Sequence, residues 1–296
     1  MVVRTNRFYL EPKGMKNLGN TCFFNSSMQC LLSINEFVSF YKSTSFSSAM
    51  PVSLAFSEFI KNYESSSNVY PDKLISILRK KINIFNGEQQ DAHEFVLRFL
   101  EILHNELPTI KNINCKEIFL EHCDQNIISN LFYSLNKQIV SCMKCGSSSE
   151  SFVLLNMMQV DVCETTQKSL DKVFKDEEID GSGVWKCERC GYTKSAIKKL
   201  EVIIYPKVLI LYIKRFTTLL GKNTKHIIVD DKIKLENSLF YLMGVCCHNG
   251  SINSGHYISD CKRAGKWMNY NDTNVSSNVG NYNGSNPYMI FYTKTI

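Results

Sequence analysis

The sequence contains no apolar run that approaches the roughly 20 residues needed to span a membrane as a helix. Its first residues, MVVRTNRFYLEPKG, lack the long apolar segment of a secretory signal peptide. Positive charge is not concentrated either, because the formal net charge of +6 is spread along the chain, with its densest clusters at residues 79–81 and 214–215. These absences predict a chain without membrane or nucleic-acid partners, located in the cytoplasm or the nucleus.

The 296 residues are enough to bury a large core. Residues 1–13 contain no recognisable module and are interpreted as a short leader. Residues 14–107 carry apolar side chains at helical spacing, whereas shorter apolar runs with β character begin at about residue 130. The sequence therefore predicts an α+β fold with a helical first half and a second half of mostly antiparallel sheet.

Residues 14–32, GMKNLGNTCFFNSSMQCLL, place Cys22 after a Gly- and Asn-rich loop and at the start of an apolar-periodic run. We expect a helix here, with Asn20 or Thr21 as its N-cap and Cys22 in its first turn. Unpaired backbone N–H groups and the helix dipole favour a thiolate at such a position. A cysteine there is otherwise a small buried apolar residue, so a nucleophile requires a base and an orienting group elsewhere in the chain.

Residues 86–107, NGEQQDAHEFVLRFLEILHNEL, show the clearest helical periodicity. A wide apolar stripe recurs at Ala92, Phe95, Val96, Phe99, Leu100 and Leu103. Gln89, Gln90 and Asp91 crowd the expected first turn, where an acidic residue suits the helix dipole whatever the function. The dipole does not explain two adjacent glutamines, whose amides can hold a neighbouring loop or a ligand backbone.

Two Cys-x-x-Cys pairs, each followed directly by glycine, stand out among the twelve cysteines: Cys142 with Cys145, and Cys187 with Cys190. Four such thiolates form a tetrahedral Zn²⁺ site without an open position, which is a structural rather than a catalytic site. Residues 146–186 exceed the usual spacing of a compact zinc ribbon, so we expect an extended hairpin-like insertion pinned at its base.

Disulfides are the alternative for these pairs, but a long chain without a secretory signal favours metal binding. A nucleic-acid module is a further alternative for such a site. Its neighbourhood is acidic, with Glu150, Asp161, Asp171, Asp176, Glu177, Glu178 and Asp180. A protein partner suits this charge better. The remaining cysteines are interpreted as free thiols: Cys22, Cys30, Cys115, Cys123, Cys163, Cys246, Cys247 and Cys261.

A histidine-containing hairpin is predicted within residues 248–275, HNGSINSGHYISDCKRAGKWMNYNDTNV. A flexible loop leads to His256, and the chain then reverses so that Asn271 and Asp272 return close to it. Such a hairpin supplies the side-chain acceptor that fixes the tautomer and orientation of an imidazole base. Together with Cys22, it has the ingredients of a Cys-His-Asn site.

These motifs together resemble the catalytic core of the ubiquitin-specific proteases, which are papain-like deubiquitinating cysteine proteases. GNTCFFNSSMQCL resembles their Cys box, GEQQDAHEF their Gln-Gln-Asp signature and PKVLILYIKRF their central strand. YLMGVCCHNGSINSGHYISDC and WMNYNDTNV resemble the His box, and PYMIFY the closing strand. The order of the motifs and the two zinc knuckles also match, so the resemblance covers nearly all of residues 14–295.

The resemblance implies a role for each catalytic position. Cys22 is the implied nucleophile, His256 its base and Asn271 the third member. Asp272 matches the aspartate that follows in the family pattern, on which some members rely. Asn17 matches the side chain of the oxyanion hole, whose amide donates to the tetrahedral intermediate. Three further positions match residues that hold loops and contact the C-terminal tail of ubiquitin: Gln89, Gln90 and Asp91.

The family also implies a papain-like fold with a helical thumb at about residues 14–107, zinc-pinned β fingers at about 130–199 and an antiparallel-sheet palm at about 200–295. The expected reaction is thiol-dependent hydrolysis of the peptide or isopeptide bond after the C-terminal glycine of ubiquitin. One structural Zn²⁺ and no catalytic cofactor are expected. The implied partners are ubiquitin and ubiquitinated proteins, and the motifs do not specify an activating protein.

Three alternatives remain at the level of sequence. The first is a ubiquitin-binding scaffold with an inactive site, although every triad position is filled. The second is a papain-like hydrolase for a ubiquitin-like modifier, and the third is a zinc module that only binds proteins.

Overall fold

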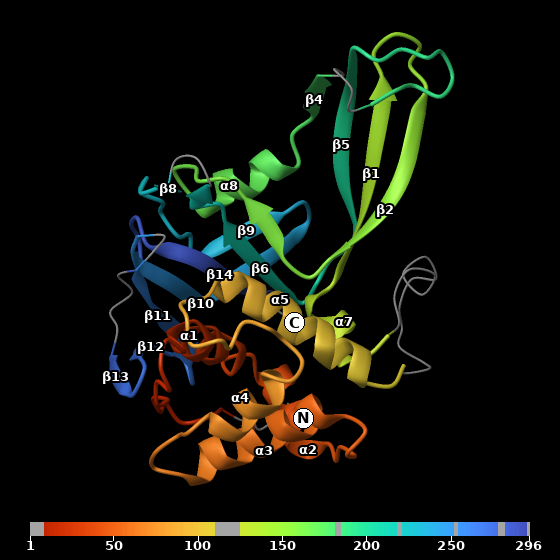
Figure 1. The fold of residues 1–296 in the computed structure, drawn as a ribbon. Helices are drawn as coiled ribbons and strands as arrows, with labels where there is room; N and C mark the ends of the chain where they lie inside the picture. Colours follow the sequence, from red (N-terminus) through yellow and green to blue (C-terminus); the bar gives the residue numbers. More distant parts are fainter. Residues whose placement is uncertain are drawn as a thin grey trace, which may run out of the picture.

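The computed structural model describes residues 9–109, 125–180, 185–217, 221–251, 254–277 and 282–294 (Figure 1). Residues 1–8 of the predicted leader and the predicted thiols Cys115 and Cys123 lie outside them. The helices before the first strand are α1 (Cys22–Leu31), α2 (Asn35–Ser43), α3 (Pro51–Ser65), α4 (Asp72–Leu78), α5 (Ala92–Glu106) and α7 (Ile127–Phe132). They gather at one end of the molecule, and the sheets lie beyond them (Figure 1). The predicted division into a helical first half and a sheet-rich second half is confirmed.

Helix α1 is a core helix, since every one of its residues is buried. The ring of Phe24 lies 5.1 Å from the ring of Phe95 on α5. Elsewhere on the helix, Sγ of Cys30 lies 3.6 Å from Sγ of Cys261, which belongs to a strand of the larger sheet. Packing between helices and sheet therefore fixes the position of Cys22, the first residue of α1.

Helix α5 confirms the predicted apolar stripe but begins later than expected. The stripe residues Ala92, Phe95, Val96, Phe99, Leu100 and Leu103 are all fully buried. Asp91 is the N-cap, with an extended backbone (φ −82°, ψ 122°). Gln89 and Gln90 therefore lie in the loop before the helix rather than in its first turn.

The larger sheet has eight strands. In spatial order they are β13 (Asn274–Ser277), β12 (Lys266–Asn271), β11 (Gly255–Arg263), β10 (Ser238–Gly250), β14 (Pro287–Lys294), β6 (Val208–Ile213) and β3 (Met158–Val160), and β9 (Lys232–Leu235) pairs with β10 beside this path. Its pairs are antiparallel except that of β3 with β6. The predicted hairpin of residues 256–261 and 267–270 is confirmed as β11 and β12, with Ser259 opposite Tyr270.

A smaller sheet of four strands projects from the rest of the molecule (Figure 1). Its order is β2 (Ser148–Leu155), β1 (Ser134–Cys142), β5 (Ser195–Ile204) and β4 (Glu177–Asp180). The residues between the two cysteine pairs do not form the separate hairpin-like insertion that we predicted. They return to the larger sheet as β3 and continue into α8 (Thr166–Val173), because Met158 and Val160 on β3 are buried beside β6.

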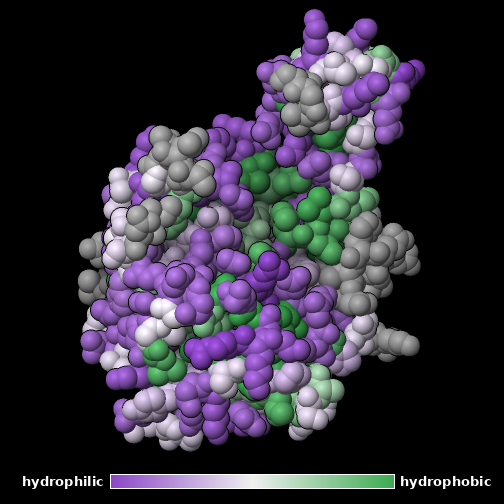
Figure 2. All heavy atoms as spheres, in the orientation of Figure 1, coloured by the Kyte–Doolittle hydropathy of each residue, from purple (hydrophilic) through white to green (hydrophobic). Residues whose placement is uncertain are grey.

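None of the helices in the described ranges combines the length and the apolar character needed to cross a membrane. The surface in the view of Figure 2 is mostly hydrophilic, and hydrophobic side chains gather where the projecting sheet meets the rest of the molecule (Figure 2). Partly buried apolar residues pack around Leu135 at this junction: Tyr133, Phe152, Leu154, Ile203 and Ile204.

Candidate active site

Cys22 opens α1 directly after Thr21, as predicted, although Thr21 makes no side-chain cap bond. The Cys22 residue is 5% exposed. Burial raises the pKa of the Cys22 thiol, a backbone hydrogen bond from Tyr257 lowers it, and the negative charge of Asp272 raises it again. The net pKa lies above the usual value, so the expected preference for a thiolate is wrong in sign. Backbone N–H groups do act as predicted, but burial outweighs them.

His256 is the second residue of β11, and its side chain is 40% exposed. Its Nε2 lies 2.7 Å from Oδ1 of Asn271, the last residue of β12. The predicted return of the chain therefore brings these two residues together. Among the described residues, no hydrogen bond joins His256 to Cys22. The two are brought near each other by Tyr257, which follows His256 and bonds the Cys22 thiol through its backbone.

Asp272 lies in the turn after β12 and has a left-handed backbone (φ 51°). Its Oδ2 lies 4.0 Å from Nε2 of His256, beyond hydrogen-bond distance. The carboxylate instead accepts hydrogen bonds from the amides of Asn17 (2.9 Å) and Asn25 (2.7 Å). Asn271 is therefore the direct partner of the imidazole, and Asp272 holds the loop before Cys22 and the first turns of α1.

Asn17 uses both ends of its amide. Its Nδ2 donates to Asp272, and its Oδ1 accepts from the backbone N–H groups of Gly19 (3.0 Å) and Thr21 (3.1 Å). The predicted oxyanion-hole residue thus folds the loop tightly before Cys22. Since an amide nitrogen carries two hydrogens, Nδ2 can bond Asp272 and still offer one hydrogen to a ligand.

Gln89 clamps the loop that precedes His256. Its Nε2 donates to the carbonyl oxygen of Gly255 at 2.8 Å, and its Oε1 accepts from the N–H of Gly255 at 2.7 Å. Gln90 instead bonds Asn86 at 2.8 Å, within its own loop. The expected loop-holding role therefore falls to Gln89, which joins the helical part to β11.

Asp91 is largely structural. Its Oδ1 accepts from the backbone N–H of His93 at 2.8 Å, and its Oδ2 accepts from the hydroxyl of Tyr288 at 2.6 Å. Burial opposes ionisation of Asp91, but the bonds from His93 and Tyr288 outweigh it, so the pKa of this carboxyl is lowered. Asp91 therefore fixes the start of α5 against β14.

A pocket of about 240 Å³ opens beside Cys22. It is lined by Cys22, Gln89, Gln90, Asp91, Phe216, His248, Gly255 and Tyr257. His248 was not among the predicted site residues. Its ring lies 4.6 Å from that of Tyr257 and 5.1 Å from that of Phe216. Burial lowers the pKa of His248 to about 4, so the imidazole of this residue is uncharged near neutral pH.

Sequence reasoning missed two residues for different reasons. His248 stands at the start of the motif that contains His256, and this position was the available signal. Asn25 follows Cys22 by three residues, which places both on neighbouring positions of a helix surface. Its partner Asp272 lies 247 residues away, and nothing in the local pattern indicates that pairing.

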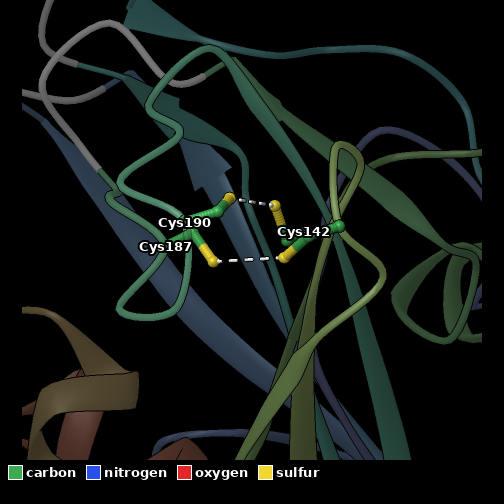
Figure 3. Close-up of side chains that lie close together, drawn as sticks. Cys142, Cys187 and Cys190 are labelled. Atoms are coloured by element: carbon green, nitrogen blue, oxygen red, sulfur yellow. Dashed lines mark hydrogen bonds between the residues drawn. The ribbon is translucent and has the colours of Figure 1, made fainter.

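The four predicted metal-binding cysteines converge at the projecting sheet (Figure 3). Their sulfurs all lie within 4.8 Å of one another. Sγ of Cys145 lies 3.7 Å from that of Cys187, and Sγ of Cys142 lies 3.8 Å from that of Cys190. Four sulfurs about 2.3 Å from a tetrahedral ion are about 3.8 Å apart, so the cluster fits a structural metal. The other cysteines within the described residues, at positions 22, 30, 163, 246, 247 and 261, are free.

Comparison with known families gives a match over nearly the whole chain. The family described as ubiquitin carboxyl-terminal hydrolase matches residues 13–292. The chain is 27% identical to ubiquitin carboxyl-terminal hydrolase 25 of Arabidopsis thaliana, over 96% of this chain and 47% of that protein. It is 26% identical to ubiquitin carboxyl-terminal hydrolase Usp2 of Drosophila melanogaster, over 95% of this chain and 35% of that protein. It therefore spans less than half the length of these two relatives.

Solved structures give the same fold. The chain is similar to a chain of the SAGA DUB module of Ubp8, Sgf11, Sus1 and Sgf73 bound to monoubiquitin, with a TM-score of 0.80, 26% identity and coverage of 96% of this chain and 69% of that chain. It is also similar to a chain of the SAGA DUB module of the same four proteins bound to ubiquitin aldehyde, with a TM-score of 0.80, 25% identity and coverage of 100% of this chain and 72% of that chain.

Proposed function

The chain belongs to the ubiquitin carboxyl-terminal hydrolase family, and we propose that it is a deubiquitinating cysteine protease. It hydrolyses the peptide or isopeptide bond after the C-terminal glycine of ubiquitin. The observation that carries this proposal is the hydrogen bond of 2.7 Å between Nε2 of His256 and Oδ1 of Asn271. Tyr257, the residue after His256, bonds the Cys22 thiol through its backbone, so the imidazole and the thiol lie in the same part of the site. That arrangement leaves Nδ1 of His256 as the proton acceptor for Cys22.

The reaction begins with a thiol rather than a preformed thiolate, because burial and Asp272 raise the pKa of Cys22. His256 takes the thiol proton as the sulfur attacks the carbonyl carbon of the terminal glycine. It then returns the proton to the leaving amine, and an acyl-enzyme remains on Cys22. His256 next takes a proton from water as the water oxygen attacks the acyl carbon. The C–S bond then breaks, ubiquitin leaves with a free C-terminal carboxyl group, and His256 returns the proton to Cys22. Asn271 keeps the imidazole oriented throughout.

Asn17 donates its free amide hydrogen to the oxyanion that develops in each tetrahedral intermediate. Removal of one such donor costs roughly 2.7–4 kcal/mol of transition-state stabilisation. The bonds of Asn17 to Asp272, Gly19 and Thr21 support this role, since an amide held in place before the reaction needs no reorganisation during it.

The pocket beside Cys22 receives the C-terminal tail of ubiquitin. Its small volume and the neutral wall of His248 suit a Gly-Gly segment without side chains. Gln89 holds the wall formed by Gly255, and Gln90 and Asp91 also line the pocket. Deubiquitinases act on ubiquitin and ubiquitinated proteins, and the similar SAGA DUB modules bind monoubiquitin or ubiquitin aldehyde.

The globular body of ubiquitin rests against the projecting sheet and the apolar surface at its base (Figure 2). In this proposal the thumb comprises about residues 14–107, the fingers about 130–199 and the palm about 200–295. Cys142, Cys145, Cys187 and Cys190 hold one structural Zn²⁺ in the fingers, supported by sulfur separations that fit a tetrahedral ion. The free cysteines at six described positions support a reducing location in the cytoplasm or the nucleus.

A ubiquitin probe with a C-terminal electrophile tests the function. Wild type should form a covalent adduct, Cys22→Ala should form none, and Cys163→Ala should react as wild type does, because Cys163 lies outside the pocket. Adduct formation by Cys22→Ala, or its absence in wild type, would contradict the proposal. Reaction only with the probe of a ubiquitin-like modifier would instead assign that modifier as the substrate.

A further inference from the structure

Asn25 is a buried amide one helical turn after Cys22, and it is 3% exposed. Its Nδ2 donates to Oδ1 of Asp272 at 2.7 Å and lies 3.4 Å from the carbonyl oxygens of Met15 and Lys16. Its own Oδ1 is buried and has no hydrogen-bond partner in the part of the chain that the structure describes. Three acceptors surround the nitrogen, so a flipped amide would direct its oxygen at a carboxylate and two carbonyls. The orientation of Asn25 is therefore determined by its surroundings.

Leaving a buried carbonyl oxygen without a hydrogen-bond partner costs free energy, because the oxygen gives up its bonds to water on folding. An apolar residue at position 25 would avoid this cost. What the amide gains in return is its bond to Asp272, whose side chain is 17% exposed. Within the described residues, the carboxylate of Asp272 has no ion pair with lysine or arginine, and Nε2 of His256 lies 4.0 Å from its Oδ2. Neutral amides therefore solvate this charge.

The two oxygens of Asp272 divide their bonds between two amides. Oδ1 accepts from Asn25 on α1, and Oδ2 accepts from Asn17 in the loop before Cys22. The backbone is held as well, since the carbonyl oxygen of Asp272 accepts from the N–H of Met15 at 2.8 Å. Without the bond from Asn25, the carboxylate can rotate, and the bond that aligns Asn17 changes with it.

We infer that Asn25 is a positioning residue of the active site, which acts on Asn17 through Asp272. Asn25 fixes the carboxylate of Asp272, and the carboxylate fixes the amide of Asn17 toward the oxyanion. This inference rests on the proposed function. Because the oxyanion exists only in the transition states and intermediates, loss of Asn25 lowers kcat and leaves KM nearly unchanged.

The test is a double-mutant cycle between Asn25 and Asn17 on the full chain, with a fluorogenic C-terminal amide of ubiquitin as substrate. Asn25→Ala should lower kcat about 10-fold or more, and Asn17→Ala about 10²–10³-fold. If Asn25 acts through Asn17, the double variant should be no more than about 3-fold worse than Asn17→Ala alone. A residue that lowers kcat independently of Asn17 would instead give losses that multiply in the double variant.

Gln29→Ala is the matched control, because Gln29 is also a buried amide on α1, 1% exposed, but bonds Lys13 and Arg263 away from the pocket. It should lower the melting temperature without lowering kcat of the folded protein. If Asn25→Ala does not fold, Asn25→Leu supplies the cycle, since it keeps a similar branched shape and removes both donor hydrogens. Wild-type kcat in either folded Asn25 variant, or multiplying losses in the cycle, would overturn the inference.

The two proposals fail in different ways. If wild type does not cleave the substrate and forms no adduct with the ubiquitin probe, the proposed function fails and the role of Asn25 fails with it. If wild type is active but the Asn25 variants keep the wild-type kcat, only the positioning role of Asn25 fails. The same conclusion follows if wild type is active and the loss of kcat in the Asn25 variants multiplies with that of Asn17→Ala.

Discussion

Nε2 of His256 and Oδ1 of Asn271 lie 2.7 Å apart, at the open end of the β11–β12 hairpin. An amide oxygen only accepts, so this contact places a proton on Nε2 and leaves the lone pair of a neutral imidazole on Nδ1. In the proposed mechanism, Asn271 thus determines which ring nitrogen accepts the proton of Cys22. A neutral amide orients the ring in this way but stabilises the imidazolium less than a carboxylate would.

Substitution of His256, Asn271 and Asp272 should lower kcat/KM to different extents. His256→Ala should lower kcat/KM by about 10³-fold or more, because it removes the base, and Asn271→Ala by about 10-fold, because it removes only the orienting bond. Asp272→Ala should be as harmful as Asn271→Ala or worse, since it frees the amides of Asn17 and Asn25. Steady-state cleavage of a ubiquitin fluorogenic substrate measures all three, and wild-type rates for both Asn271→Ala and Asp272→Ala would refute these assignments.

Removal of the negative charge at position 272 should make Cys22 more acidic. Asp272 raises the pKa of the Cys22 thiol, so Asp272→Asn should lower that pKa. The rate of Cys22 alkylation by iodoacetamide, followed by mass spectrometry from pH 6 to 10, should therefore rise at lower pH in the variant than in wild type. Asp171→Asn is the control, because Asp171 lies on α8, away from the pocket. An unchanged profile for Asp272→Asn would contradict the charge effect.

Loss of the Gln89 clamp should loosen the loop before His256. Gln89→Ala removes both bonds to the Gly255 backbone and should lower kcat/KM by about 10-fold. Gln89→Glu should be similarly impaired, because a carboxylate accepts from the N–H of Gly255 but cannot donate to its carbonyl. Asn86→Ala, which removes only the partner of Gln90 and a bond within that loop, is the comparison and should be milder. Equal losses in all three variants would argue against a specific clamp.

The cysteine cluster should contain one Zn²⁺ per chain, measured by elemental analysis. Cys142→Ser should abolish zinc binding and destabilise the fold by several kcal/mol, because a structural metal contributes its binding energy to folding. Cys163→Ser should keep the metal, since Cys163 lies outside the cluster. A metal-free wild type with the same melting temperature before and after treatment with a chelator would contradict a structural zinc.

Acid should destabilise the protein through His248. Burial holds the pKa of His248 at about 4, below its value of about 6.5 in an unfolded chain. Above pH 6.5 His248 is neutral in both the folded and the unfolded protein, so it does not make stability depend on pH. Between pH 6.5 and 4 His248 is protonated only in the unfolded protein, so the free energy of unfolding falls as the pH falls. The loss is about 3 kcal/mol by pH 4. Urea titrations across this range should show a smaller drop for His248→Phe, and equal drops in both proteins would exclude His248 as the cause.

Much of the fold was predictable because its signals are local. The apolar stripe of α5 and the alternation of loop and strand around His256 each depend on neighbouring residues. The two Cys-x-x-Cys pairs were equally local, because each supplies its own tight turn and its own two sulfurs. These elements needed no knowledge of what they pack against.

The remaining features depend on distant partners. The net pKa of Cys22 follows from how deeply α1 is buried, which the 10 residues of that helix do not reveal. The carboxylate of Asp272 points to Asn17 and Asn25 rather than to His256, because its left-handed backbone turns it toward α1. Sequence proximity placed Asp272 beside the imidazole, and only tertiary packing could show where its oxygens are directed.

The position of β14 in the sheet has a consequence for synthesis on the ribosome. β14 follows every other described strand in the chain, yet it lies between β10 and β6. At about 5–20 residues per second, it emerges on the order of ten seconds to a minute after α1. During that interval the reactive thiol has been made, while the sheet that must present its histidine is still missing an interior strand. The active site of the proposed protease therefore forms only after β14 has been made, so translation itself delays its assembly.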